Sequence, residues 1–122
     1  MTTYVVLLPG DENAWESASE EHRSQTYAKH GEFARALAER GHTITGGAEL
    51  THSREAHVVR RGDDGVTVTE GPYAETVEQL TGFYVVDSDD LDDLLEVVAV
   101  LADAEGAVEV RAATGGATGP TS

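Results

Sequence analysis

Residues 69–84, TEGPYAETVEQLTGFY, connect two strand-like segments through a long loop that begins at Gly71-Pro72. Proline fixes its own φ, donates no backbone N–H and moves the preceding residue out of the helical region, so a turn is expected here. A hairpin needs about two to five connecting residues, whereas roughly ten intervene here. The loop carries carboxylates, a hydroxyl and an aromatic ring. These features are typical of a functional loop, and a plain spacer is the alternative.

The chain before this loop predicts a strand and a helix. Residues 4–8 are β-branched and apolar and indicate a buried strand closed by Pro9-Gly10. A polar loop at 11–18 holds Trp15, which we expect to pack over the next helix or at a subunit contact. The pattern then predicts a helix from about residue 19 to Arg40, with a Ser17-x-x-Glu20 capping box and Gly41 just beyond its end.

The remaining chain predicts further strands, a second helix and a tail. Paired glycines at 46–47 imply a bulge or a close backbone approach, and residues 62–65 form a hairpin turn. A helix begins after the acidic cap at 87–90. The tail at 113–122 is expected to be flexible, so that residues 1–112 form the domain. The expected strands are 43–50, 56–61, 66–69, 82–86 and 107–111.

This order of elements predicts an α+β fold, namely a ferredoxin-like βαββαβ core with an inserted β-hairpin. Two helices can cover only one face of the sheet. Residues 4–8 and 83–86 are nevertheless apolar at both alternating positions, so both faces require burial. We therefore expect a two-fold homodimer that buries the helix-free faces.

The composition limits the classes of function. The 122 residues carry a formal net charge of −15, which disfavours direct binding to nucleic acid or to anionic membranes. This acidity indicates either adaptation to a salt-rich cytoplasm or the composition of a GC-rich genome. The chain has no cysteine and no apolar run of membrane-spanning length, so a cytoplasmic protein is expected.

The segment from Glu70 to Tyr84 resembles the signature of the YCII-related family in its DGPF branch. The branch motif is Asp-Gly-Pro-Phe followed by Ala-Glu-Thr-Lys-Glu-Gln-Leu-Gly-Gly, and the chain departs from it at Glu70, Tyr73, Val77 and Thr81. The resemblance extends weakly over residues 2–112. It implies a dimeric α+β barrel, and it implies little about the reaction.

His30 is the first candidate for a catalytic residue. It lies in the apolar stripe formed by Tyr27, Phe33, Ala34 and Leu37, where a histidine can also be a purely structural, hydrogen-bonded residue. The resemblance implies a functional role. In the wider YCII-related family, a histidine at this spacing before the glycine that ends the helix works with an acidic residue. Imidazole suits proton transfer near neutral pH.

The acidic partner is predicted to be Glu70, which occupies the aspartate position of the branch motif, with Glu49, Glu75 and Glu78 as alternatives. A carboxylate there would fix the imidazole tautomer. The expected ligand-binding residues are Tyr27, Pro72, Tyr73, Glu75 and Thr76. Glu75 could instead cap the loop by accepting backbone N–H bonds, and Tyr73 and Thr76 could instead brace the loop.

No metal site and no cofactor are expected, because the histidines lack chelating spacing and the chain has no glycine-rich nucleotide motif. The leading interpretation is a homodimeric, small-molecule-binding enzyme with a His-centred pocket. Its acid–base chemistry would be lyase-like or dehydrohalogenase-like, as the resemblance implies. The alternative is a non-catalytic ligand-sensing or accessory module linked to sigma-factor-dependent transcription, which relatives of this branch suggest.

Overall fold

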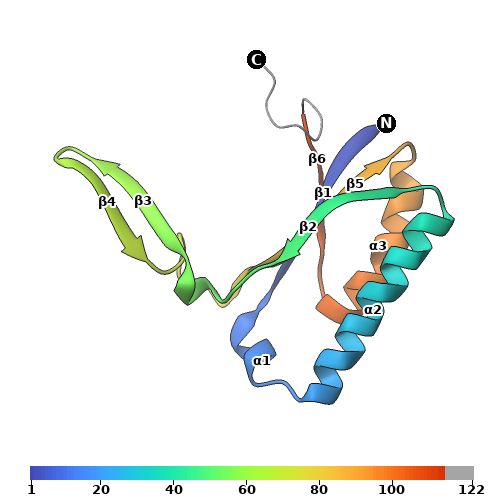
Figure 1. Ribbon diagram of the computed structural model, residues 1–122, viewed down its shortest axis with the longest axis horizontal. Coiled ribbons are helices and arrows are strands. Elements are labelled where there is room, and N and C mark those ends of the chain that lie inside the picture. Colours follow the sequence, from blue (N-terminus) through green and yellow to red (C-terminus); the bar gives the residue numbers. More distant parts are fainter. Residues whose placement is uncertain (115–122) are drawn as a thin grey trace.

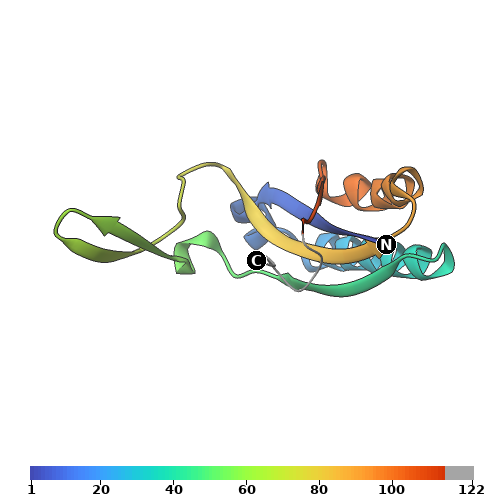
Figure 2. The ribbon, with the colours of Figure 1, turned by 90° about the horizontal axis from the view of Figure 1, so that it is seen from above.

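The computed structural model describes residues 1–114 and has the ferredoxin-like α+β fold that the sequence predicts (Figure 1). Four strands form an antiparallel sheet in the order β2-β5-β1-β6. Two long helices, α2 (Glu20–Glu39) and α3 (Leu91–Glu105), lie on one face of this sheet (Figures 1 and 2). The strands are β1 (Thr2–Asp11), β2 (Thr43–Glu49), β5 (Glu78–Ser88) and β6 (Glu109–Ala112).

The inserted hairpin forms a sheet of its own. Strands β3 (His57–Gly62) and β4 (Gly65–Glu70) pair only with each other in the described sheets, after a short 3-10 helix, η1 (Ser53–Glu55). Residues 57–70, which we call the arm, project away from the end of the main sheet (Figure 1). The predicted turn at residues 62–65 is confirmed.

The N-terminal segment differs from expectation in two places. Strand β1 continues through Pro9-Gly10 to Asp11, because a register shift between Leu8 and Pro9 absorbs the proline. The predicted loop at 11–18 contains a short helix, α1 (Glu12–Glu16). The Asp11 carboxylate caps this helix by accepting from the backbone N–H groups of Asn13 and Ala14, both at 3.1 Å.

The start of α2 also differs from the predicted capping box. Ser19 is the N-cap, and its Oγ accepts from the N–H of His22 at 3.1 Å. Ser17, two residues earlier, instead ends α1, and its Oγ donates to the carbonyl of Asn13 at 3.0 Å. The predicted role of Gly41 is confirmed, because it follows the last turn with φ of 84°.

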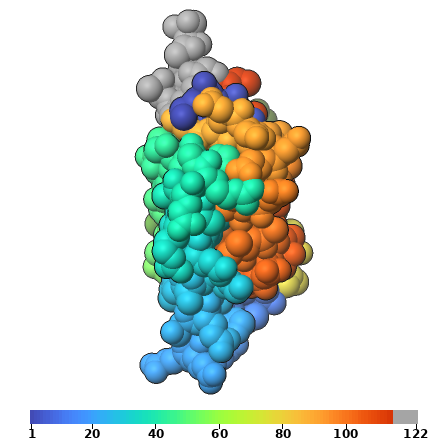
Figure 3. Space-filling view, turned by 90° about the vertical axis from the view of Figure 1, so that its right-hand side faces the viewer, coloured from blue at the N-terminus to red at the C-terminus, as the bar shows by residue number. Residues whose placement is uncertain are grey.

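The core lies between the sheet and the two helices, which pack side by side (Figure 3). Successive side chains on a strand point to opposite faces, so Val6 and Leu8 of β1 meet the helices together with Val86 of β5. The helices contribute the other fully or nearly fully buried side chains, which are Phe33, Leu37, Leu94, Val97, Val98 and Leu101.

Strand β2 approaches β5 very closely at Gly47. A Cβ there would lie 2.6 Å from the carbonyl oxygen of Phe83, and the residue has φ of 150°. Only glycine avoids both problems. The expected bulge is also present, as a register shift between Ile44 and Gly46.

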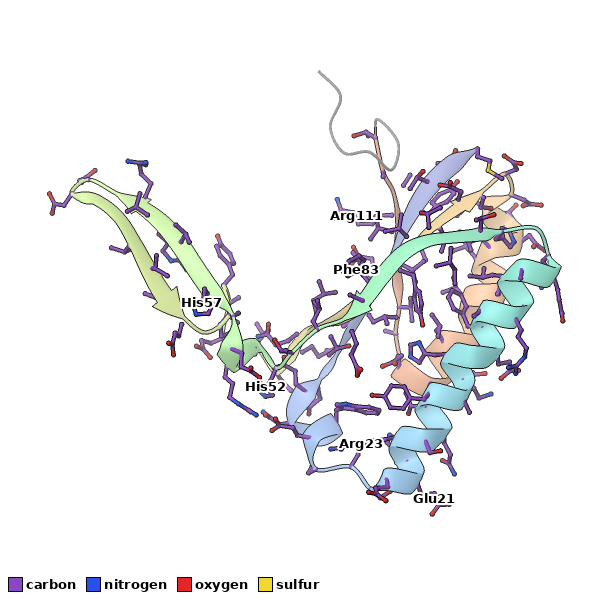
Figure 4. The ribbon with its side chains drawn as sticks, in the orientation of Figure 1. Glu21, Arg23, His52, His57, Phe83 and Arg111 are labelled. Carbon is purple, nitrogen blue, oxygen red and sulfur yellow. The ribbon has the colours of Figure 1, made fainter. Side chains whose placement is uncertain are left out.

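The opposite face of the main sheet carries no helix within residues 1–114. The register pairs Val5 with Val85 and Leu7 with Phe83, and all four side chains point away from α2 and α3. Each is partly exposed. Figure 4 shows Phe83 together with Arg111 of β6 on this side of the sheet. We call it the helix-free face.

The last described strand, β6, ends at Ala112. The N–H of Ala113 donates to the carbonyl of Thr3 at 2.8 Å, so this residue is still tied to β1. The rest of the expected tail, residues 115–122, lies outside the described residues. None of the described helices is long and apolar enough to cross a membrane.

Candidate functional site

A cavity of about 760 Å³ opens at the end of the sheet where α1, the N-terminal half of α2 and the end of α3 meet β5. We call it the main cavity. Its wall combines aromatic rings with titratable groups. The residues on which its chemistry depends are Trp15, Tyr27, His30, Glu49, Tyr84 and Glu105.

His30 lies in the wall of this cavity and contacts two side chains from different elements. Its Nδ1 is 2.6 Å from the hydroxyl of Tyr84 on β5, and its Nε2 is 2.8 Å from Oε1 of Glu105 at the end of α3. The side chains of His30 and Glu105 are 19% and 18% exposed. The cluster is therefore sheltered without being sealed from solvent.

The partners determine which ring nitrogen carries the proton in the neutral imidazole. An ionised carboxylate can only accept a hydrogen bond, so the Nε2–H of His30 donates to Glu105. Nδ1 then has a free lone pair and accepts from the hydroxyl of Tyr84. Burial, with a smaller contribution from the Glu105 carboxylate, raises the pKa of Tyr84, so the phenol holds its proton at neutral pH.

This chain of hydrogen bonds resembles that of a Ser-His-Asp triad, with the phenol of Tyr84 in place of the serine hydroxyl. The imidazole can receive the proton of Tyr84 at Nδ1, and Glu105 holds the ring and stabilises the imidazolium that forms. The ring of Tyr84 is fixed by Phe33 of α2, with ring centroids 5.1 Å apart. The arrangement can therefore move a proton at the oxygen of Tyr84.

The outer wall of the main cavity is aromatic. The ring of Trp15 on α1 packs edge to face against Tyr27 of α2, with centroids 5.6 Å apart, which confirms the expected packing of Trp15 over that helix. The hydroxyl of Tyr27 donates to both carboxylate oxygens of Glu49 at 2.8 and 3.1 Å, and this hydrogen bond raises the pKa of Tyr27. Tyr27, one of the predicted ligand-binding residues, thus lines the cavity.

The wall is also strongly acidic. Six carboxylates line it, and Arg23 is the single Lys or Arg among its lining residues. The guanidinium of Arg23 is occupied, because Nε and Nη2 donate to the carbonyl of Trp15 at 3.2 and 3.0 Å while the group stacks on the Trp15 ring. Figure 4 shows Arg23 at the same end of the molecule as His52.

Within one chain, the signature residues at 70–76 lie away from His30 in space. Glu70, Pro72, Glu75 and Thr76 line a second cavity of about 320 Å³, which adjoins the main one because Glu12 and His52 line both. The expected pairing of His30 with Glu70 is therefore replaced by a pairing with Glu105. The physical reason is that β4 belongs to the arm, which leaves the main sheet and carries residue 70 away from α2.

Several side chains of the signature segment hold the loop or face solvent. The hydroxyl of Thr76 donates to the carbonyl of Glu78 at 2.5 Å, and the amide of Gln79 donates to the carbonyl of Ala74 at 2.8 Å. Tyr73 is 79% exposed and stacks against Arg60 of the arm. Thr76 thus makes the bracing contact that was the alternative to ligand binding.

Glu12 separates the two cavities and was not singled out from the sequence. It is buried, and its carboxylate accepts from the N–H and the hydroxyl of Ser53 at 2.7 and 2.6 Å. The imidazole of His52 lies beside it and contacts Asn13 Oδ1 at 2.9 Å. These contacts fix the start of α1 to η1.

A second histidine cluster contains the same residue types as a Ser-His-Asp catalytic triad, but its role is structural. His42 lies 2.8 Å from Ser88 Oγ and 2.7 Å from Asp93 Oδ2. Ser88 is 1% exposed, and its Oγ accepts from the N–H of Asp90, so no substrate reaches it. The hydrogen bond from His42, helped by Arg40, lowers the pKa of Asp93. These interactions of the Asp93 carboxylate stabilise the fold at pH values above the ordinary pKa of an aspartate. That stabilisation is lost as the pH falls through the lowered pKa of Asp93.

Within residues 1–114 no three His, Asp or Glu side chains form a group that could hold a metal ion.

The fold and the main cavity define a small, ferredoxin-like α+β domain with a Tyr-His-Glu cluster in an open pocket. The model of the YCII-related domain matches residues 2–114. An uncharacterized protein of Rhizobium meliloti (strain 1021) is 32% identical over 111 residues, which are 88% of this chain and 89% of that protein. The chain therefore belongs to the YCII-related family. Membership of the DGPF branch stays a prediction from residues 70–76.

Proposed function

We propose that the main cavity binds an uncharged or cationic small organic molecule with a ring, and that the Tyr84–His30–Glu105 cluster transfers a proton at that molecule. The observation that carries this proposal is the continuous chain of hydrogen bonds in the cavity wall, at 2.6 and 2.8 Å. The resemblance to lyase-like relatives is consistent with a proton-transfer reaction.

The charge of the wall supports the preference for uncharged or cationic ligands. The carboxylates outnumber the single guanidinium, so a bound anion would be repelled. The rings of Trp15 and Tyr27 offer apolar surface and the faces that attract organic cations. Glu49 lies next to these rings and would attract a cationic group.

The proton path follows from the hydrogen bonds. The oxygen of Tyr84 takes a proton from a carbon next to a carbonyl or a leaving group, while its own proton passes to Nδ1 of His30. The electron pair of the broken C–H bond forms an enolate, or forms a C=C bond as the leaving group departs with its bonding pair. Glu105 stabilises the resulting imidazolium, which later returns the proton through Tyr84 to the enolate or to solvent.

Binding can be measured through Trp15, the one tryptophan of the chain, which lines the main cavity. We expect saturable changes in its fluorescence with benzyl alcohol and benzylamine, and binding of benzoate that is weaker by about tenfold or more. Glu49→Gln should narrow the difference between benzylamine and benzoate. Glu39→Gln, an equal charge change at the exposed end of α2, should leave that difference unchanged.

Three outcomes distinguish the alternatives in this experiment. Binding that is followed by proton transfer at the ligand supports the enzyme. Binding of a wider set of ligands, none of which is changed chemically, favours the ligand-sensing alternative. A fluorescence signal that responds to none of the three probes, or responds best to benzoate, contradicts the proposed cavity.

We also propose that two chains pair through their helix-free faces. Val5, Leu7, Phe83 and Val85 form an apolar cluster on this face, and water is a poor solvent for such a cluster. Light scattering at micromolar concentration should give twice the chain mass of 12.9 kDa. A monodisperse monomer at that concentration would contradict this pairing.

A further inference from the structure

One face of the arm exposes three valines, together with His57, Arg61 and Glu70. Cross-strand partners in a hairpin share a face, so Val59 and Val68 point to the same side, and the alternation places Val66 beside them. Their exposed fractions are 65%, 62% and 52%. Three valines this exposed on one side of a narrow ribbon are not explained by contacts among residues 1–114.

A two-stranded ribbon of this kind needs support. An isolated hairpin is at best marginally stable in water, and both of its edges remain open to pairing. The arm retains regular pairing over six residues of each strand, from His57 opposite Glu70 to Gly62 opposite Gly65. A surface that packs on the valine face would supply the missing burial.

The position of the arm indicates what that surface is. Figure 1 shows α2 and α3 on one side of the main sheet and the arm on the other side, where the helix-free face also lies. A second copy that packs on the helix-free face therefore occupies the side toward which the arm projects. The arm extends beyond the end of the main sheet, so in such a pair it would reach past the paired faces to the body of the partner (Figure 1).

The charge of the arm is compatible with the same occupant. Arg60 and Arg61 of β3 are offset by Asp63, Asp64 and Glu70, so the arm carries a formal net charge of −1 (two basic against three acidic residues) in a chain whose net charge is −15. The nearly balanced arm would therefore meet the acidic body of a second copy with little repulsion.

We propose that the arm of each chain clasps a second copy of this chain, with the face formed by Val59, Val66 and Val68 packed on the partner. This clasp rests on the proposed pairing of the helix-free faces and adds a second contact to it. The arms would act reciprocally, as the two-fold symmetry of such a dimer requires.

The test compares two double variants that add the same charge to opposite faces of the arm. Val59→Asp with Val68→Asp changes the valine face, and Thr67→Asp with Thr69→Asp changes the other face of the same hairpin. We expect the first pair to raise the dimer dissociation constant roughly 100-fold in analytical ultracentrifugation, through the lost burial of two valines. The threonine pair should change it by less than about threefold.

A milder variant keeps the test independent of hairpin folding. Val59→Thr with Val68→Thr preserves β-branched side chains and removes only apolar surface, and it should still weaken the dimer by about tenfold. A wild-type dimer whose dissociation constant is unchanged in both valine pairs would overturn the clasp and leave the sheet pairing intact. Equal weakening by the threonine pair would also overturn it. A wild-type monomer would overturn both the clasp and the pairing.

Discussion

His30→Gln is expected to keep the fold and ligand binding while losing proton transfer by a factor on the order of 10²–10⁴. The glutamine amide can donate to Glu105 and accept from Tyr84, so both hydrogen bonds of the imidazole have a replacement. The amide cannot take up a proton at neutral pH. The variant therefore separates the position of the cluster from its chemistry.

The measurement is hydrogen–deuterium exchange at the carbon next to the carbonyl of 2-tetralone, an uncharged ring ketone, followed by NMR. The wild type should accelerate this exchange over buffer, and His30→Gln should return it nearly to the buffer rate. Lys29→Gln is the matched control, because it introduces a glutamine at the neighbouring position of α2, where the side chain is exposed. Exchange in His30→Gln at the wild-type rate would show that the imidazole does not carry the proton.

The second large effect is expected from salt. If the formal net charge of −15 is an adaptation, repulsion among carboxylates destabilises the fold in dilute buffer, and counterions relieve that repulsion. The melting temperature should then rise by several degrees between dilute buffer and about 1 M potassium chloride. The midpoint is measured by circular dichroism.

Sucrose at matched osmolality is the control for this experiment, since it favours compact states without screening charge. A rise in sucrose equal to that in potassium chloride would assign the effect to solvent exclusion. A melting temperature that does not change with salt would favour the alternative, in which acidity reflects the composition of the genome.

The order of the main elements could be predicted because each one has a local signal. The apolar stripe around Phe33 and the glycine at 41 predict α2, and the valine-rich segments predict the strands. The short helix α1 was missed, because five residues carry too little periodicity to distinguish a helical turn from a loop. Ser17 and Ser19 are both good caps, and the choice between them depends on α1.

The candidate site could be predicted only in part. His30 was found because a titratable group in an apolar stripe is visible in the sequence. Glu105 was missed because it is 75 residues from His30, and their contact depends on how α3 packs against α2. The angle at which the arm leaves the sheet, which separates Glu70 from His30, has no signal of its own in the sequence.

The sequence does contain a pattern that identifies Tyr84 as a residue of the site. Tyr84 alternates with Val86, so both side chains point to the helix-covered face, where α2 places His30. In the sequence this tyrosine was grouped with the apolar residues of its strand. A polar tip on a core-facing aromatic residue requires a hydrogen-bond partner, and His30 supplies it.

The most direct test of the central claim is a long-range ¹H–¹⁵N spectrum of the His30 ring in its neutral form, recorded with and without 2-tetralone. The Tyr84–His30–Glu105 cluster predicts a proton on Nε2 and none on Nδ1, and it predicts that the Nδ1 shift moves when the ketone occupies the cavity beside Tyr84. A proton on Nδ1, or ring shifts that stay the same at saturating ketone, would contradict a proton-transfer site at His30.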